Sequence, residues 1–528
     1  GSLVAVATGH VDELAARLPS ALLATLTILA VFWVAAERWG APAGVFAGFV
    51  LATSFEWMRA ATTARVDMTL TAFLVAAFLS FWVAASWRTP PRGPLACFYV
   101  AMGFAALGKG PVGIILPGFV AFLYLVARRQ LTVSRILSFQ PFVGGAVAIL
   151  IPGLWYALAI TTGGDAFVQK QLYAENVGRF FAAESSGAGH EHSPLYLVGG
   201  FFTGFAPWSL FIVPLGVYLW QHRTRLEEEG FLYPLLWFAA VFVFYSLSQS
   251  KRTVYLLPLY PAAALLLGAW WKRLTEQESL MPAVVVRALQ ATGFVMAAAL
   301  VLVLAVLLAE GIGAEPLERI RPLLHPKDQS NLPVVRDLIE ARFAVLTLWI
   351  VALLPVLVIF VASLGRRRWG LVFASMVAFI ASTTSMVNGV FHPAIAWQRT
   401  FKPFLEIVRG VLEPGDQLFF YRKTFDYGAI FYSGRRIPRL KKDETPPPSN
   451  GARNYVLVWE RSWDKLPEEE AERLQFLHKS DGTGPKGENR LVFARVKPVD
   501  AETTEPDATP PAEPAPVPSP TPAGPQKG

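Results

Sequence analysis

Long apolar stretches that are almost free of charge recur along the first three quarters of the chain. Each runs for about 17 to 25 residues, the length of helix needed to cross the hydrocarbon core of a bilayer. Several contain Pro or Gly, as is usual for bundled membrane helices. The pattern predicts an all-α polytopic membrane bundle over residues 1–395 with about twelve spans, which start near residues 19, 42, 68, 93, 111, 139, 195, 231, 254, 287, 343 and 369.

The pattern changes at about residue 396. Short runs bounded by Gly, Asp and Asn follow, namely "DQLFFYRK", "YGAIFYSG", "NYVLVWE" and "RLVFARVK". Such runs are typical of strands. They predict a small extracytoplasmic α/β domain over residues 396–498. Residues 499–528 are rich in Pro and Ala and cannot bury a core, so we expect a disordered tail there.

Composition agrees with a membrane protein. Hydrophobic residues make up 53% of the chain and charged residues only 16%, which is more apolar than an ordinary soluble domain. A single cysteine excludes a disulfide within the chain and a site built from several thiolates. The net charge of +8 comes mostly from Arg in short connections, without the basic and aromatic stripe typical of nucleic-acid binding. Membrane lipids are therefore the expected partners of these residues, and nucleic acid is not.

The Lys and Arg residues of the short connections also predict the orientation. If the first residue lies outside, most of them fall on the inner side, where membrane insertion retains them. This orientation predicts a multi-pass protein of the inner (plasma) membrane with its C-terminal domain outside. The residues assigned to the inner side are Arg38, Arg88, Arg92, Arg128, Arg129, Arg135, Arg223, Arg225, Lys272, Arg273 and Arg366 to Arg368.

Polar residues gather in the connections assigned to the outer side. Any one of them is most often a simple interfacial anchor. Together, at least four connections bring cations and carboxylates to one membrane face, as a site for a negatively charged lipid head group would need. Asp67 precedes an apolar run and is either a helix N-cap or a residue of that site. The group consists of Glu56, Arg59, Arg65, Asp67, Lys109, Asp165, Glu175, Asn176, Arg179, His190, Glu191, His192, Lys251, Arg252 and Tyr255.

The segment "GHEHSP" raises the question of a metal ion. Imidazole and carboxylate are suitable ligands for a divalent ion, so His190, Glu191 and His192 could hold one. Two His at i and i+2 without a third ligand in sequence are a weak signal. A solvated loop explains the segment nearly as well.

Eight motifs in order resemble one family. They are "RLPSALLATLTILAVFW", "ARVDMTLTAFL", "GKGPVGIILPG", "LWYALA", "AENVGRF", "GHEHSP", "APWSLF" and "YSLSQSKRTVYLLPLYPA", within residues 13–262. The series resembles the lipid A aminoarabinose transferase and protein O-mannosyltransferase superfamily, which are membrane glycosyltransferases of the GT-C fold (glycosyltransferase families 39 and 83). The resemblance implies transfer of a sugar from a polyprenyl phosphate carrier to a lipid, glycan or protein acceptor at the outer face.

The resemblance also implies roles for individual residues. Cations would stabilise the negative charge left on the carrier phosphate, and a carboxylate would take the proton of the acceptor hydroxyl. His190 matches a histidine that helps to bind a metal ion in some relatives, and one extra residue before Pro194 leaves His192 as the alternative. The resemblance implies that the donor phosphate is contacted by Lys109, Arg179, Lys251 and Arg252. It implies that the donor cavity is lined by Asp67, Glu175, Asn176 and Tyr255.

Two departures from the family pattern change the expectations. Many relatives read Ser-Lys-x-Pro-x-Tyr where residues 250–255 of this chain lack the Pro and gain Arg252. Relatives also begin with a further span and an outer loop that carries an Asp-Glu pair, whose Asp is the general base. Asp12 and Glu13 only superficially supply that pair. We therefore expect the chain to lack the first span and loop, and the catalytic base to lie outside this sequence.

A polytopic transporter or flippase of a lipid-linked sugar is the rival interpretation. Transporters usually carry polar residues at mid-membrane depth and show paired repeats, whereas here the spans are internally apolar and the polar residues lie at one face. A polysaccharide ligase or polymerase is a second rival, disfavoured by the order of the motifs. The sequence determines neither the sugar nor the acceptor.

Overall fold

The computed structural model describes residues 12–167, 193–248, 251–277, 281–324, 329, 332–441, 444, 453–484 and 489–497. The chain divides into two compact units. The first comprises Gly1–Leu308 and Ala344–Ser385, and the second comprises Ala309–Phe343 and Met386–Gly528.

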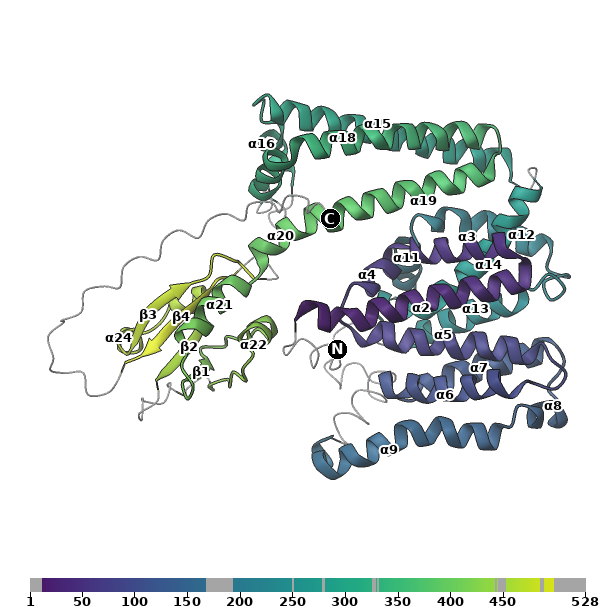
Figure 1. The fold of residues 1–528 in the computed structure, drawn as a ribbon, viewed down its shortest axis with the longest axis horizontal. Coiled ribbons are helices and arrows are strands. Elements are labelled where there is room, and N and C mark those ends of the chain that lie inside the picture. Colours follow the sequence, from purple (N-terminus) through teal and green to yellow (C-terminus); the bar gives the residue numbers. More distant parts are fainter. Residues whose placement is uncertain are drawn as a thin grey trace, which may run out of the picture. The chain divides into compact units, whose positions relative to one another are not determined.

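The first unit is a bundle of helices, many of which run side by side (Figure 1). Three of its helices, α15, α18 and α19, extend beyond the boundaries of the unit. The elements are α2 (Glu13–Trp39), α3 (Ala41–Ala52), α4 (Phe55–Ala61), α5 (Val66–Ala85), α6 (Arg92–Lys109), α7 (Val112–Ala127), α8 (Val133–Ser138), α9 (Pro141–Phe167), α11 (Pro194–Gly204), the 3-10 helix η2 (Trp208–Phe211), α12 (Ile212–Gln221), α13 (Leu232–Leu247), the 3-10 helix η3 (Thr253–Leu259), α14 (Tyr260–Glu276), α15 (Ala283–Gly311), α18 (Leu332–Gly365) and α19 (Trp369–Met386).

The bundle confirms the predicted polytopic all-α membrane fold. Among the described residues, seven helices are long and apolar enough to cross a membrane, and the pair Leu195–Gly204 and Trp208–Gln221, bent by 111°, is an eighth candidate. The helices α3, α7 and α13 are apolar but have only 12, 16 and 16 residues. All twelve predicted starting points fall in a helix or within two residues of one. There are fewer full-length spans than predicted because an apolar window does not reveal where a helix breaks.

Small residues let the helices of this unit approach closely. Gly40 separates α2 from α3 with a φ of 93°, a conformation that favours glycine. A Cβ on Gly44 of α3 would lie 2.6 Å from the carbonyl oxygen of Phe32 in α2. A Cβ on Gly268 of α14 would lie 2.6 Å from the backbone nitrogen of Ala47 in α3. Close packing at small residues is how membrane helices associate where apolar burial supplies little driving force.

The second unit contains a four-stranded sheet in the order β1-β2-β4-β3. The strand β1 (Gln417–Phe420) is parallel to β2 (Asn454–Trp459). The strand β4 (Leu491–Val496) is antiparallel to both β2 and β3 (Leu474–Lys479). This sheet with its helices confirms the predicted small α/β fold. The remaining elements are α16 (Pro316–Ile320), η5 (Arg321–Leu323), the π-helical segment η6 (Val387–Phe391), α20 (His392–Arg399), α21 (Lys402–Val411), α22 (Tyr427–Ser433), α23 (Glu460–Trp463) and α24 (Glu468–Glu472).

The structure corrects one of the four predicted strands. The run "YGAIFYSG" forms helix α22, because the side chain of Asp426 accepts a hydrogen bond from the backbone nitrogen of Ala429 at 2.8 Å. Gly434 then ends the helix with a φ of 65°. These are N-cap and C-cap signals that outweigh the strand preference of the aromatic residues. The third strand in chain order, β3, was not among the predicted runs.

Candidate functional site

Asp67 and Lys109 form an ion pair at one end of the bundle. Asp67 lies in the first turn of α5, where Arg65 is the N-cap, and Lys109 is the last residue of α6. The Lys109 Nζ donates a hydrogen bond to the Asp67 Oδ1. The side chains are 27% and 13% exposed, so the pair is largely shielded from water. Asp67 is thus bound to a cation from another helix and does not N-cap its own.

Tyr255 completes this cluster from a third part of the chain. It lies in η3, with its backbone nitrogen donating to the carbonyl of Arg252 at 3.0 Å. The Lys109 Nζ lies 4.9 Å from the centre of its ring, within the range of a cation–π contact. The structure therefore brings together three residues that the sequence assigned to one site.

Lys251 and Arg252 stand in the connection that leads into η3. Lys251 is only 7% exposed, and its Nζ donates to the carbonyl of Ser248 at 2.7 Å. Arg252 is exposed. Both precede Tyr255 by at most four residues, so two more cations lie in the segment that carries one member of the cluster.

A small cleft beside Asp67 adds two arginines that the sequence analysis placed on the outer side without a role. Arg59 and Arg65 line it together with Asp67 and Val254. Arg59 makes two hydrogen bonds to the carboxylate of Glu56, at 2.9 and 2.5 Å. These bonds raise the pKa of Arg59 above its usual value. In the sequence, four charged residues within positions 56–67 of an otherwise apolar region are the signal that could have indicated this cleft.

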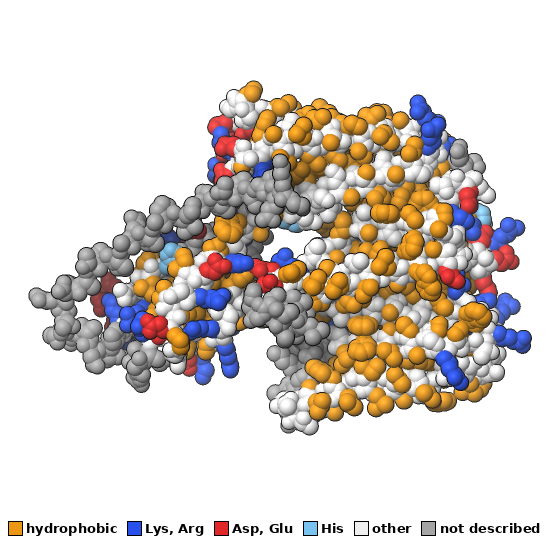
Figure 2. Space-filling view, viewed as in Figure 1, with side chains coloured by type: hydrophobic (Ala, Val, Ile, Leu, Met, Phe, Trp, Pro, Cys, Tyr) orange, Lys and Arg blue, Asp and Glu red, His pale blue; other side chains and the backbone are white. Residues whose placement is uncertain are grey.

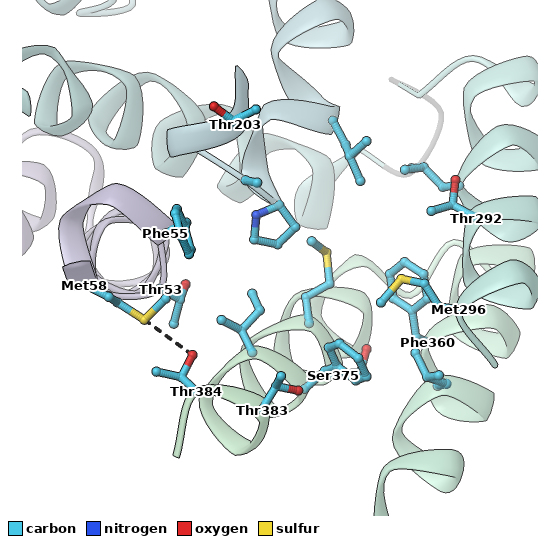
Figure 3. Close-up of a pocket in the computed structure, with 18 residues that line it drawn as sticks. Thr53, Phe55, Met58, Thr203, Thr292, Met296, Phe360, Ser375, Thr383 and Thr384 are labelled. Carbon is cyan, nitrogen blue, oxygen red and sulfur yellow. Dashed lines mark hydrogen bonds between the residues drawn. The ribbon is translucent and has the colours of Figure 1, made fainter. Parts of the chain in front are cut away.

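An apolar cavity of about 460 Å³ is lined in part by side chains of α4 (Figure 3). Phe55 and Met58 reach it from α4, Met296 from α15 and Thr384 from α19. The Thr384 hydroxyl donates to the Met58 sulfur at 3.6 Å. Threonine hydroxyls and methionine sulfurs are the main polar atoms among otherwise hydrocarbon walls. A cavity of this size and lining suits a hydrocarbon chain better than a sugar.

The remaining predicted site residues lie outside the described residues. The structure has no description of residues 168–192, so the roles of Glu175, Asn176, Arg179, His190 and His192 stay predictions. Within the described ranges, no group of three or more His, Cys, Asp or Glu could hold a metal ion. The divalent metal therefore also stays a prediction.

Residues 2–156 match the family model described as dolichyl-phosphate-mannose-protein mannosyltransferase. An undecaprenyl phosphate-alpha-4-amino-4-deoxy-L-arabinose arabinosyl transferase of Enterobacter sp. (strain 638) is 28% identical over 266 residues, 49% of this chain and 46% of that protein. A protein of the same name, numbered 1, from Pseudomonas fluorescens is 31% identical over 259 residues, 48% of this chain and 45% of that protein. The chain spans about half the length of the curated relatives that it matches.

A solved structure extends the likeness to most of the chain. The crystal structure of ArnT from Cupriavidus metallidurans bound to undecaprenyl phosphate is similar with a TM-score of 0.66 and 20% identity. The similarity covers 92% of this chain and 84% of that one. The chain thus has the fold of that structure, a multi-pass membrane bundle of the GT-C fold. The resemblance to the lipid A aminoarabinose transferase and protein O-mannosyltransferase superfamily is confirmed.

Proposed function

We propose that this chain is an inverting membrane glycosyltransferase that moves a sugar from a polyprenyl phosphate carrier to a lipid, glycan or protein acceptor. The observation that carries the proposal is the convergence of Asp67, Lys109 and Tyr255, from three separate segments, at one end of the bundle. The names of the relatives favour undecaprenyl phosphate as the carrier.

The chemistry needs positive charge near the departing phosphate. The acceptor hydroxyl gives its proton to a general base and its oxygen forms a bond to the anomeric carbon. The bond from that carbon to the phosphate oxygen breaks, and the electron pair stays on the carrier phosphate. Lys109, Lys251 and Arg252 would stabilise that charge, with Arg179 as a further candidate from the predicted set. Asp67 orients the Lys109 ammonium. Because Asp67 is engaged in this way, we do not assign it as the proton acceptor.

The orientation is part of the proposal. The basic connections at the opposite ends of the helices favour placing the polar cluster and the C-terminal unit at the outer face of the inner membrane. The apolar cavity near α4 would hold a hydrocarbon chain of a lipid substrate. Arg59 of the same helix lines the cleft beside Asp67, so α4 borders both regions that one lipid would occupy.

The test is transfer from a defined donor by the complete purified protein in lipid nanodiscs. We expect Lys109→Ala to lower kcat/KM by about 10²- to 10³-fold, the usual loss when one group that stabilises transition-state charge is removed. The matched control is Lys272→Ala in α14, where the lysine forms an ion pair with Glu276 at 3.1 Å. Equal activity of both variants would reject the site. Movement of the lipid-linked sugar across the bilayer of sealed proteoliposomes, without transfer, would favour the flippase instead.

A further inference from the structure

A second polar cavity lies at the end of the bundle opposite the Asp67–Lys109 pair. Helix α5 connects the two sites, because Asp67 lies in its first turn and Ser86 is its C-cap. The helix rises about 1.5 Å per residue, so the two positions are about 28 Å apart. The cavity has a volume of about 590 Å³, and Ser86 lines it together with Arg38, Trp82, Arg128, Glu227 and Glu228.

Two arginines are held in fixed positions in this cavity. The Arg38 guanidinium lies 4.7 Å from the centre of the Trp82 ring and donates to the Trp82 carbonyl at 3.1 Å. It also donates to the Ser86 hydroxyl. The Arg128 guanidinium lies 5.6 Å from the centre of the Tyr124 ring. The buried Arg128 Nε has no hydrogen-bond acceptor among the described residues.

Two carboxylates face the same space from the connection between α12 and α13. Glu227 forms an ion pair with Arg128 at 2.6 Å, and Glu228 is exposed. The charged residues that line the cavity are therefore two cations and two carboxylates, and their charges cancel. A purely anionic group would be attracted by the arginines but repelled by Glu228. A group that carries both signs would match both sets.

The surroundings of the cavity are those of a membrane surface. Lys, Arg, Asp and Glu side chains gather at the right-hand end of the bundle, while hydrophobic side chains cover its flank (Figure 2). Phe122 and Val126 of α7, within two turns of Arg128, are 49% and 44% exposed. Trp87, which directly follows Ser86, is 59% exposed, and tryptophan is enriched where helices leave the bilayer. Acyl chains can thus lie beside a head group in the cavity.

We infer that this cavity binds the head group of a phospholipid with a phosphate and a primary ammonium, such as phosphatidylethanolamine, from the leaflet opposite the transfer site. Arg38 and Arg128 contact the phosphate, and Glu228 accepts hydrogen bonds from the ammonium. The volume is within the range of small-molecule sites. Binding here is independent of sugar transfer, so it can be tested even if the proposed activity is wrong.

The test is native mass spectrometry of the full chain mixed with defined phospholipids. We expect phosphatidylethanolamine to be retained about tenfold more than phosphatidylglycerol or phosphatidylcholine. This preference corresponds to a binding free energy difference of about 1.4 kcal/mol. Phosphatidylglycerol lacks the ammonium, and the trimethylated group of phosphatidylcholine cannot donate hydrogen bonds to a carboxylate. Equal retention of phosphatidylglycerol would show that the cavity does not recognise the ammonium, and would overturn the proposal.

Variants separate the two halves of the site. Arg38→Gln should lower the retention of all three phospholipids, because each carries the phosphate, and Glu228→Gln should shift the preference toward phosphatidylglycerol. The control is Arg223→Gln, since Arg223 lies in the same connection but over the Trp220 ring at 5.1 Å, outside the cavity lining. If Arg38→Gln does not fold, Glu228→Gln at its exposed position decides the matter. Unchanged lipid preference in Glu228→Gln contradicts the inference.

Discussion

The Lys109 ammonium at the end of α6 is bound by the Asp67 carboxylate in the first turn of α5, 42 positions earlier in the chain. The same ammonium lies over the Tyr255 ring from η3. A cation held by a carboxylate and an aromatic face is fixed in position before any ligand arrives, which is how enzymes prepare stabilising charge.

Asp67→Asn should keep the fold and lower transfer. The amide removes the negative charge that positions Lys109, so we expect kcat/KM to fall by about 10- to 100-fold, less than for Lys109→Ala. Steady-state kinetics in nanodiscs measures the effect. Glu276→Gln, which removes the carboxylate from the Lys272–Glu276 ion pair at 3.1 Å in α14, provides the matched control. A larger loss in the control than in Asp67→Asn would contradict the role of the pair.

Filling the apolar cavity should impair use of a lipid substrate. Met296 lines the cavity, whereas its neighbour Val295 is 68% exposed on the same helix. Met296→Trp should raise KM for one lipid substrate about tenfold or more, while Val295→Trp should have little effect. Varying the donor and the acceptor separately shows which lipid occupies the cavity. Unchanged KM for both substrates in Met296→Trp would leave the cavity without a part in the reaction.

The orientation can be tested by labelling a single cysteine. Replacement of Cys97, which is exposed on α6, by Ser provides a background without thiols. In that background Ser186→Cys should react with a membrane-impermeant maleimide in intact spheroplasts, and Arg223→Cys should react only after the membrane is opened. The opposite pattern would reverse the proposed sides.

His190 and His192 are the predicted ligands of a divalent metal ion. If either ligates a divalent ion that orders the surrounding loop, a chelator should lower activity strongly, and readdition of the ion should restore it. Elemental analysis of the purified protein provides an independent readout. A metal content below about a tenth of an equivalent, together with full activity after chelation, would remove the metal from the mechanism.

The second unit should lose stability when acidification protonates Glu470. The hydrogen bond from Arg422 lowers the pKa of Glu470 below its usual value. The ionised carboxylate therefore stabilises the fold above the ordinary carboxyl pKa of about 4.3, and this contribution is lost as the pH falls through the lowered value. Glu470→Gln should lower the free energy of unfolding by about 1 kcal/mol at pH 7, and the difference from the native chain should vanish in acid.

Hydrogen exchange of β1 in the full-length protein measures this effect. The exposed neighbour Glu469 provides the control, because Glu469→Gln removes a charge from the same helix α24 without removing the Arg422 partner. Equal protection of β1 in the native chain and in Glu470→Gln at pH 7 would contradict the prediction.

The sequence by itself determined that the chain forms a membrane bundle followed by a small α/β unit. Apolar windows of span length have few other options, because a backbone in lipid must satisfy its hydrogen bonds internally as a helix. The sequence also determined which connections carry charge, and therefore the candidates Asp67, Lys109, Lys251 and Tyr255. These are local properties that can be read along the chain.

Only the tertiary structure decided which of these charges meet. The Asp67–Lys109 pair, the place of Tyr255 beside it and the cavity between Arg38 and Glu228 each depend on which helix ends become neighbours. The helix α22 was likewise decided by capping at Asp426 rather than by the preferences of its own residues. Periodicity and composition report how a segment faces its surroundings, whereas an ion pair or a cavity depends on segments far apart in sequence, whose arrangement is fixed by packing.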